Sequence, residues 1–395
     1  MPLPDYKNSI VNLMTSIIQS YNQNYKSPYK ALQQIPALEL KQTTNIVFFV
    51  IDGLGYEYLQ RYGKKIKDSV LQINCRAKIT SVFPSTTAAA ITTFNTGAAP
   101  QQHALTGWYM YLKELGIVST ILQFTPRIGG VPFSKTNVDP KLIFCEKSIF
   151  EKINAAKYIV NGLDIISSDY SIVMTNKAKR YAYKNLNQCC KTIKHIVRNV
   201  HNNQNKQKRK FIYAYWPYFD SYCHHYGTTS KITLKHFKRL NMKINALAKQ
   251  LSGTNTVIIV TADHGLIDTS KERTIFLKDH PKLQETLVMP LTGERRVAYC
   301  YVRPNKTKQF EQYVKQKFRK ECKLYKSEEL VRKGYFGLGL ENPRLAERIG
   351  DYTLIMKENY IIFDELLGEE RSFHIGNHGG TSKEEMFVPL IVIKC

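Results

Sequence analysis

The sequence predicts an α/β fold in which a doubly wound, mostly parallel sheet carries helices on both faces. Four continuous apolar runs have the profile of strands that are buried on both sides, and segments with a helical pattern lie between them. Strands that alternate with helices favour such a sheet, whose ligands bind beyond the carboxyl ends of the strands. The chain has 395 residues, of which 43% are hydrophobic. This is enough for one large domain with insertions, or for two domains.

The first apolar run, 45–51 (NIVFFVI), ends at Asp52 and Gly53, so a carboxylate follows the first predicted strand directly. Three later runs share its profile and are predicted to be buried parallel strands: 211–216 (FIYAYW), 256–261 (TVIIVT) and 387–393 (FVPLIVI). Helical patterns cover 184–200 and 234–251.

Two stretches fit this sheet poorly and are predicted to be insertions. One covers about 108–169 and contains the Pro/Gly-rich run PRIGGVPFS. The other covers about 268–374 and has its own strand signal (RRVAYCYV) and a helical segment over 308–320, which predicts a smaller α+β subdomain near the active-site rim. Residues 1–40 are predicted to form an N-terminal helical extension. The catalytic domain is predicted over 41–267 and 375–395, and within it 201–210 is predicted to be an exposed basic loop.

Charge and composition limit the classes of function. The net charge of +25 favours anionic partners such as phosphate esters, nucleic acid or an anionic membrane surface, although a solvated lysine-rich surface gives the same number. The sequence has neither a signal-peptide pattern nor an apolar run near the ~18 residues of a membrane span, so it predicts a cytoplasmic protein. The eight cysteines include no CxxC pair, which predicts reduced thiols in the core.

An isolated acidic residue is the first candidate for chemistry. Asp220 is the only acidic residue between Asp169 and Asp263, and it lies just past a predicted strand, in YWPYFDSYCHHYG. His224 and His225 follow four and five positions later. One turn could therefore offer a carboxylate oxygen and an imidazole nitrogen to a divalent cation, while the alternative is a solvated turn residue.

Further candidate ligands stand next to the other predicted strands. Asp263 and His264 follow one strand in TADHG, where the adjacent glycine allows a sharp turn, and Asp52 follows another. His378, in NHGG, precedes the last predicted strand, and His374 competes with it for a role as a ligand. A turn-capping role is the alternative for the aspartates.

Hydroxyl residues open the helix predicted after Pro84. In FPSTTAAAI, the residues Ser85, Thr86 and Thr87 stand at the helix N-terminus, where free backbone N–H groups and the helix dipole favour a phosphoryl group. One hydroxyl could also cap the helix while another reacts.

These motifs together resemble those of the nucleotide pyrophosphatase/phosphodiesterase family in the alkaline phosphatase superfamily. The segments that carry the resemblance are, in order, VIDGLG, VFPSTTAAAITTFNTG, DSYCHHYG, TADHG and NHGGTSKEEMFVPLIV. GERRVAYCYV and ERIGDYTLI also resemble segments of bacterial members. The resemblance implies an alkaline-phosphatase-like fold and hydrolysis of phosphodiester or phosphoanhydride bonds.

The resemblance also implies two metal sites. Asp220, His224 and His378 would hold one ion. The other would be held by Asp52, Asp263 and His264, together with the nucleophile. The family's ions are usually zinc, and ligands that are all nitrogen and oxygen suit zinc without excluding manganese or iron.

The nucleophile is a threonine in this family, nine positions before the threonine of a T-G pair. Counting back from Thr96 gives Thr87, with Thr86 and then Ser85 as alternatives. The family's common position, two residues before the proline, holds Val82 here. The asparagine that assists phosphate binding in many members has no clear counterpart, and Trp108 and Tyr109 occupy its neighbourhood.

We therefore expect a two-metal phosphodiesterase or nucleotide pyrophosphatase that forms a phosphothreonine intermediate on a nucleotide-like substrate. Aromatic residues around Asp220 could stack a base or belong to the core: Tyr215, Trp216, Tyr218, Phe219 and Tyr222. A phosphomonoesterase would usually bind the additional phosphate charge with an arginine, and Arg76, Arg127 and Arg348 are candidates. Lipid phosphodiesters, phosphonates and sulfuryl transfer are further alternatives. An alternative of another class is a non-catalytic protein that binds nucleic acid or membrane through the basic region 177–249.

Overall fold

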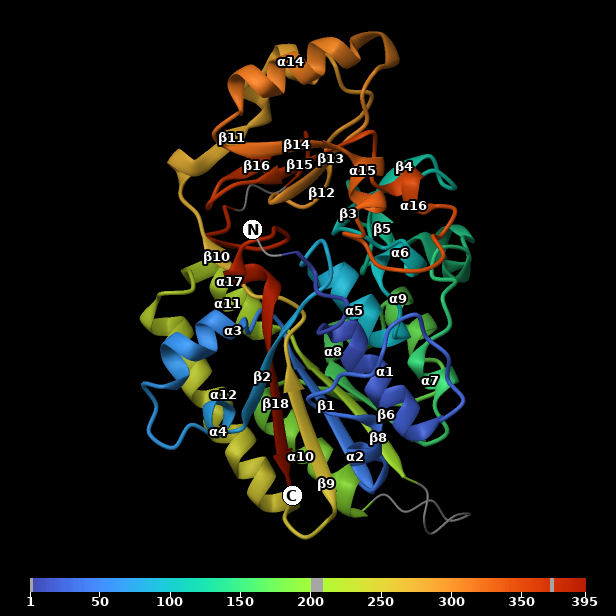
Figure 1. Cartoon of the computed structure of the whole chain (residues 1–395), viewed down its shortest axis with the longest axis vertical. Coiled ribbons are helices and arrows are strands. Elements are labelled where there is room, and N and C mark those ends of the chain that lie inside the picture. Colours follow the sequence, from blue (N-terminus) through green and yellow to red (C-terminus); the bar gives the residue numbers. More distant parts are fainter. Residues whose placement is uncertain (1–2, 200–208, 370–372) are drawn as a thin grey trace.

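Two sheets, one above the other in Figure 1, organise the molecule. The computed structural model describes residues 3–199, 209–369 and 373–395. The larger sheet has seven strands in the order β2-β18-β9-β1-β8-β6-β7. Its strands are β1 (Asn45–Ile51), β2 (Cys75–Thr80), β6 (Ala156–Gly162), β7 (Lys179–Tyr183), β8 (Lys210–Trp216), β9 (Thr256–Thr261) and β18 (Phe387–Lys394). The mixed, mostly parallel α/β sheet confirms the predicted fold class.

Three of the predicted strands form the centre of this sheet. β1 pairs in parallel with β8 on one side and with β9 on the other. Every residue of β1 and of β9 is buried. The continuous apolar runs arise because these central strands are buried on both faces of the sheet.

The last strand runs against its neighbours. β18 pairs antiparallel with both β9 and β2, so the parallel orientation predicted for 387–393 is wrong. Ile391 pairs with Val260, so the start of β18 lies beside the carboxyl end of β9. The chain therefore enters β18 from that edge of the sheet. A strand that is buried on both faces has the same apolar run whether it is parallel or antiparallel to its neighbours. The loop before β18 is thereby brought to the ligand-binding edge.

The stretch 108–169 divides between the two sheets. β3 (Tyr109–Leu112), β4 (Ile117–Thr120) and β5 (Thr125–Pro126) lie in the second sheet. β6, however, pairs with β8 inside the main sheet, so this end of the stretch is not an insertion. Its apolar signal is weak, because its buried side chains are confined to Tyr158, Ile159 and Val160.

The second sheet is antiparallel throughout and joins both predicted insertions. Its order is β14-β15-β13-β12-β3-β4-β5, with Gly293 of β12 paired to Tyr109 of β3. The strands from the second insertion are β12 (Thr292–Gly293), β13 (Val297–Cys300), β14 (Cys322–Lys326) and β15 (Tyr352–Met356). The predicted helix over 308–320 is α14 (Thr307–Lys317), at the top of Figure 1.

The main helices match the helical patterns of the sequence. α10 (Leu186–Asn199) and α12 (Lys231–Leu251) pack side by side, and α5 (Thr87–Thr96) follows the hydroxyl-rich segment. α1 (Ile10–Tyr21) packs on α5 and is almost entirely buried, so this part of 1–40 belongs to the main core. Most of the predicted loop 201–210 lies outside the described residues.

Short elements complete the described part of the chain. The helices are α2 (Ala37–Lys41), α3 (Tyr56–Tyr58), α4 (Val70–Ile73), α6 (Pro100–His103), α7 (Ile149–Lys152), α8 (Leu163–Ile166), α9 (Asp169–Met174), α11 (Tyr218–Tyr226), α13 (Pro281–Gln284), α15 (Ser327–Arg332), α16 (Leu345–Arg348) and α17 (Lys383–Met386). The strands are β10 (Ile267–Asp268), β11 (Thr274–Phe276), β16 (Ile361–Phe363) and β17 (Gly376–Asn377). Among these described helices, none has the length and apolarity needed to span a bilayer.

A buried ion pair links the second sheet to the main sheet. Arg296, which precedes β13, contacts Glu385, which precedes β18, with 2.8 Å between Nη2 and Oε2. Both side chains are fully buried. Glu385 also accepts a hydrogen bond of 2.7 Å from the backbone N–H of Gly380. The pair therefore fixes the loop between β17 and β18.

Candidate active site

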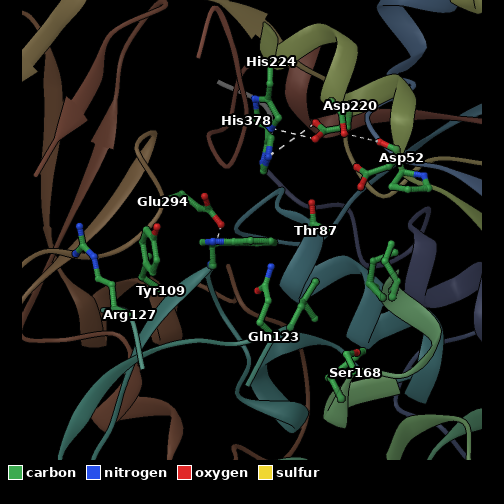
Figure 2. Close-up of a pocket in the computed structure, with 18 of the residues that line it drawn as sticks. Asp52, Thr87, Tyr109, Gln123, Arg127, Ser168, Asp220, His224, Glu294 and His378 are labelled. Atoms are coloured by element: carbon green, nitrogen blue, oxygen red, sulfur yellow. Dashed lines mark hydrogen bonds and ion pairs between the residues drawn. The ribbon is translucent and has the colours of Figure 1, made fainter. Parts of the chain in front are cut away.

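A cavity of about 720 Å³ opens where the two sheets meet, beyond the carboxyl ends of the parallel strands. Predicted site residues that line it are Asp52, Thr87, Asp220, His224 and His378. Figure 2 shows Asp52, Asp220, His224 and His378 gathered at one end of this cavity, with Thr87 below them. Asp263 and His264 are fully buried next to this group.

One ligand cluster consists of Asp52, Asp263 and His264, whose ligand atoms lie within 4.8 Å of one another. His264 Nε2 is 3.4 Å from Asp52 Oδ1 and 3.5 Å from Asp263 Oδ2. Asp52 follows β1 and Asp263 follows β9, and these strands are neighbours in the sheet. Parallel pairing therefore brings the two carboxylates together.

A second cluster consists of Asp220, His264 and His378, also within 4.8 Å. His378 Nε2 is 4.0 Å from Asp220 Oδ1, and its ring stacks on that of His264 with centroids 3.8 Å apart. His264 thus belongs to both clusters. His224 lies at the side of this second cluster, with its Nε2 3.0 Å from Asp220 Oδ2. α11 places Asp220 and His224 on one face, because they are four residues apart.

Backbone contacts orient two of the imidazoles. His224 Nδ1 lies 2.7 Å from the carbonyl oxygen of Gly376, and His264 Nδ1 lies 3.1 Å from that of Gly265. A carbonyl oxygen accepts a hydrogen bond from Nδ1–H, which places the proton on Nδ1 and leaves Nε2 free to act as a ligand. In both residues Nε2 is the nitrogen that faces the carboxylates.

The donor set fits divalent cations. Four buried atoms of the candidate ligands lack a hydrogen-bond partner among the described residues: Asp52 Oδ1, Asp220 Oδ1, Asp263 Oδ2 and His378 Nδ1. Burial and the nearby Asp263 and Asp220 raise the pKa of Asp52 well above its usual value. Crowded buried carboxylates of this kind are stabilised by a cation, and ligation by carboxylate oxygen and imidazole nitrogen suits zinc.

The protonation states suit metal binding as well. Burial lowers the pKa of His378 well below its usual value, and the neighbouring His264 lowers it further, which keeps the imidazole neutral. Burial tends to raise the pKa of Asp220, but the charge of His224 and its hydrogen bond to the carboxylate lower that pKa below its usual value. A neutral imidazole and an ionised carboxylate are the forms that bind a metal.

The three candidate nucleophiles have different hydrogen-bond partners. Thr87 Oγ1 lies 3.0 Å from His264 Nε2, at the junction of the two clusters. The hydroxyl of Thr86 donates to Glu294, and that of Ser85 donates to the carbonyl oxygen of Gly380 at 2.7 Å. Thr86 occupies the N-cap position of α5, yet its side chain makes no capping hydrogen bond. Of these hydroxyls, that of Thr87 is the one that contacts a ligand cluster.

Glu294 is a cavity residue that the sequence reasoning missed. It lies between β12 and β13 and accepts hydrogen bonds from the Thr86 hydroxyl and from the backbone N–H of Trp108, the latter at 2.8 Å. Burial raises its pKa to about 7. Figure 2 shows its side chain beside the cavity, between Tyr109 and Thr87. GERRVAYCYV marked this region only as a strand and a family segment.

The remaining histidine candidates lie apart from the clusters or beside them. His225 is exposed. His374 lines the cavity with its ring centroid 4.4 Å from that of His224, and burial and His224 lower its pKa to about 3. Neither belongs to the two clusters found among the described residues.

The candidate arginines have other partners. Arg76 pairs with Glu39 on the surface, and Arg348 pairs with Glu114. Arg127 lines the cavity, but Glu369 holds its guanidinium with two hydrogen bonds, and it covers the ring of Tyr109 at 4.4 Å.

The candidate aromatic residues divide between core and cavity. Trp216 and Phe219 are buried in the core. Tyr215 lines the cavity and donates to Asp52. Trp108 and Tyr109 also line the cavity, in the neighbourhood of the asparagine that the family resemblance implies. Tyr218 is exposed, and Tyr222 stacks on His236.

Comparisons with known proteins identify a family and a shared fold. The family model described as type I phosphodiesterase/nucleotide pyrophosphatase matches residues 46–381. No curated protein matches the sequence significantly. Murine ectonucleotide pyrophosphatase/phosphodiesterase 5, solved as an inactive variant in complex with AMP, is 17% identical, with a TM-score of 0.65 and 87% of each chain covered.

The human counterpart of that protein has a similar structure. It is 16% identical, with a TM-score of 0.63, and the match covers 89% of this chain and 87% of the other. At such identity the likeness shows a shared fold.

Proposed function

Because this chain belongs to the type I phosphodiesterase/nucleotide pyrophosphatase family, we propose that it is a metal-dependent hydrolase of phosphodiester or phosphoanhydride bonds with Thr87 as its nucleophile. The observation that carries the proposal is the position of the Thr87 hydroxyl, 3.0 Å from the histidine that belongs to both ligand clusters. A reactive group at the junction of two cation sites is what two-metal phosphoryl transfer requires.

The residues that would hold the ions are those of the two clusters together with His224. Asp220, His224 and His378 would bind one ion, and Asp52, Asp263, His264 and Thr87 the other. Bound there, two divalent ions, zinc first and manganese as the alternative, would offset the charge on phosphoryl oxygens and lower the pKa of a bound hydroxyl or water.

The chemistry on the protein side is two displacements at phosphorus. The Thr87 oxygen forms a bond to phosphorus as the bond to the leaving oxygen breaks, which gives a phosphothreonine. Water then forms a bond to phosphorus as the bond to the Thr87 oxygen breaks, which releases a phosphate monoester and, with a proton from the water, restores the threonine hydroxyl. The N-terminal N–H groups of α5 lie next to Thr87, and they would stabilise the phosphoryl oxygens throughout.

A nucleotide-like diester is the proposed substrate class. The murine relative was solved with AMP, which supports a nucleotide. A monoesterase would need a cation for the additional phosphate charge, and the three arginines suggested by the sequence are engaged with Glu39, Glu369 and Glu114. This engagement favours a diester.

We also propose that the positive surface attracts anionic substrates electrostatically. The outer faces of α10 and α12 carry exposed basic residues, including Lys191, Lys235, Lys238 and Lys249. Such a field raises the association rate and is screened by salt. We expect kcat/KM to fall with added salt more steeply for a dinucleotide polyphosphate than for a singly charged diester. Equal salt dependence of kcat/KM for the two substrates would contradict the proposal.

The cysteines support a reducing compartment such as the cytoplasm, as the sequence predicts. All eight lie within the described residues and are free thiols. Thiol titration of denatured protein purified without reductant should give eight free groups.

The deciding experiment is a screen of metal-free, zinc-loaded and manganese-loaded protein against nucleotide, dinucleotide, cyclic-nucleotide and lipid phosphoesters. Paired aryl monoester and diester substrates should be included. We expect hydrolysis that depends on metal and prefers the diester. Absence of bound metal together with no reactivation by zinc or manganese would refute the metal assignment, and a strong monoester preference would refute the substrate class.

A further inference from the structure

The outer side of two long helices carries charges of one sign only. α10 and α12 pack side by side, and their apolar sides belong to the same core. Arg198 of α10 donates hydrogen bonds to the carbonyl oxygens of Gln250 and Ser252, at 2.8 and 3.2 Å, so the two helices end together. Their exposed sides therefore form one continuous surface, which we call the basic face. Its exposed cations include Lys191, Lys231, Lys235, Lys238, Arg239 and Lys249.

No carboxylate balances the charges of this segment. Residues 170–262 contain 17 lysines and arginines but a single acidic residue, Asp220, which is buried among the candidate metal ligands. Among the described residues, every ion pair that involves a lysine or an arginine lies outside α10 and α12. Elsewhere on the surface cations do have partners, as Arg76 has in Glu39. The unbalanced charge is thus concentrated on one face of the molecule.

The charges of the basic face are unfavourable for α12 itself. Lys231 and Lys235 stand at its N-terminal end, where the helix dipole disfavours cations, and its first turn has no acidic residue. Lys231, Lys235 and Arg239 also follow one another at a spacing of four residues, at which like charges repel. A negatively charged partner would relieve both effects. The arrangement therefore points to a polyanionic partner rather than to a solvated surface, in which both signs are mixed.

Apolar side chains stand among the cations of the basic face. Met242 lies between Lys238 and Lys249 along the outer side of α12 and is 59% exposed. Ile232 of the same helix is 47% exposed, and Tyr226 of the adjacent α11 is 42% exposed. The phosphates and sugars of a nucleic acid backbone offer no apolar surface to such side chains. The boundary between lipid headgroups and acyl chains accepts both the cations and the apolar groups.

We propose that the basic face docks the protein on an anionic membrane surface, with its cations over the lipid headgroups and Met242 and Ile232 between them. The proposal goes beyond the hydrolase function, because docking needs neither metal nor substrate. It also differs from electrostatic attraction of a small substrate, because it holds the protein at the bilayer. Asp220 and His224 lie on the side of α11 that lines the cavity, so docking leaves these candidate ligands in place.

Vesicle flotation of the full chain, without substrate, tests the proposal. The probes are vesicles of phosphatidylcholine alone and vesicles that also contain about 30% phosphatidylserine, an anionic lipid. We expect the protein to bind the anionic vesicles, less so as the salt concentration rises above ~0.15 M, and to bind the neutral vesicles little. Equal binding to the two kinds of vesicle, or binding to neither, would overturn the proposal.

Two variants with the same loss of charge locate the site. Lys235→Gln/Lys238→Gln removes two cations from the basic face. Lys308→Gln/Lys317→Gln removes two exposed lysines from α14, which lies at the opposite end of the molecule (Figure 1). Each cation near an anionic surface contributes about fivefold in affinity, so the first variant should bind about 25-fold more weakly and the second within about threefold of wild type. Equal weakening would assign the binding to net charge and refute a specific face.

Melting temperatures show whether a loss of binding comes from unfolding. Lys235→Gln/Lys238→Gln relieves repulsion between like charges, so its melting temperature should equal or exceed that of wild type. Met242→Gln changes an exposed side chain and should melt with wild type, but the loss of apolar contact should weaken vesicle binding about threefold.

A single-stranded oligonucleotide, followed by fluorescence anisotropy, is the comparison probe. We expect Met242→Gln to leave the weak electrostatic binding of this probe unchanged, because a phosphate backbone makes no use of the methionine. Oligonucleotide binding that depends on Lys235 and Lys238, in the absence of vesicle binding, would identify a nucleic-acid surface and overturn the membrane assignment. Since neither assay involves hydrolysis, failure of the proposed function would leave both results standing.

Discussion

His264 connects the two halves of the candidate site. Its Nε2 faces Asp52 and Asp263 as well as the Thr87 hydroxyl, and its ring stacks on His378. The side chain is fully buried, so its position depends on packing rather than on solvent. A residue in this position contacts the proposed nucleophile and belongs to both clusters.

Removal of the Thr87 hydroxyl should abolish most turnover. We expect Thr87→Ala to lower kcat by on the order of 10³-fold, as for other covalent nucleophiles, while Thr87→Ser retains measurable activity because it keeps an oxygen near His264. Steady-state kinetics with an aryl diester measure both, and mass spectrometry of a quenched reaction detects a phosphorylated residue. Full turnover by Thr87→Ala would identify another nucleophile.

His103 should make the fold sensitive to acid. It is buried, accepts a hydrogen bond from the backbone N–H of Leu105 at 3.0 Å, and its pKa is lowered to about 3 by burial and by Arg348. A histidine with a depressed folded pKa contributes stability above its unfolded pKa, ~6.5, and loses it as pH falls towards 3.

Urea unfolding at pH 7.5 and pH 5 tests this effect. Between these values wild type should lose about 2 kcal/mol more unfolding free energy than His103→Gln, because glutamine does not titrate. His236, with a pKa lowered to about 4 mainly by burial, contributes equally to both proteins and cancels in the difference. Parallel losses in the two proteins would contradict the assignment.

At the scale of elements, the sequence predicts the centre of the molecule better than its periphery. Continuous apolar runs located β1, β8 and β9, because burial on both faces removes every polar position from a strand. The same kind of run over β18 was predicted to be a parallel strand, and the antiparallel pairing shows that this direction is wrong. Direction depends on where the preceding loop crosses the sheet, and apolar composition carries no information about that.

Long-range pairing explains what the sequence did not reveal about the site. Gly293 pairs with Tyr109 across a large separation in sequence, and this contact carries Glu294 to the cavity beside Trp108. Neither Gly293 nor Glu294 lies in a local sequence pattern that predicts its place at the cavity. The candidate metal ligands, in contrast, lie close to predicted strands, and Asp52, Asp220, Asp263 and His264 could be proposed from that position. The choice of His224 over His225 and of His378 over His374 rests on the family resemblance.

Glu294 should act on the nucleophile through the start of α5. Its carboxyl group accepts from Thr86 and Trp108, so Glu294→Leu leaves two donors unpaired and should cost about 2 kcal/mol of stability. We expect kcat to fall at least tenfold as Thr87 loses its position. The amide oxygen of Glu294→Gln can accept both bonds, and that variant should retain most activity. Equal loss in both variants would show that the charge, not the contact, matters.

At the scale of the whole molecule, the Arg296–Glu385 pair holds the second sheet against the main sheet. Breaking one side of a fully buried pair leaves an uncompensated charge, so Arg296→Met should destabilise by about 3–5 kcal/mol. Glu385 also holds Gly380, two residues after His378, so zinc affinity should fall too. Thermal melts and zinc titration measure both effects.

The double variant Arg296→Met/Glu385→Leu is the control for this prediction. It removes both charges, so it should recover much of the melting temperature lost in Arg296→Met. Zinc affinity should stay low, because Glu385→Leu removes the carboxylate that accepts the hydrogen bond from Gly380. Recovery of zinc affinity together with stability would show that the pair has no separate role in holding the His378 loop.

The antiparallel β18 has a consequence for how the chain is made. This strand is translated after every other strand of the main sheet, yet it lies between β2 and β9 rather than at an edge. Until the ribosome has delivered it, β9 keeps an open edge and β2 has no partner in the sheet. The histidine of the NHGG motif is translated shortly before β18, so the last candidate ligand and the strand that closes the sheet both come late in synthesis. A nascent chain that stops before β18 should be a substrate for chaperones and proteases rather than a partly active enzyme.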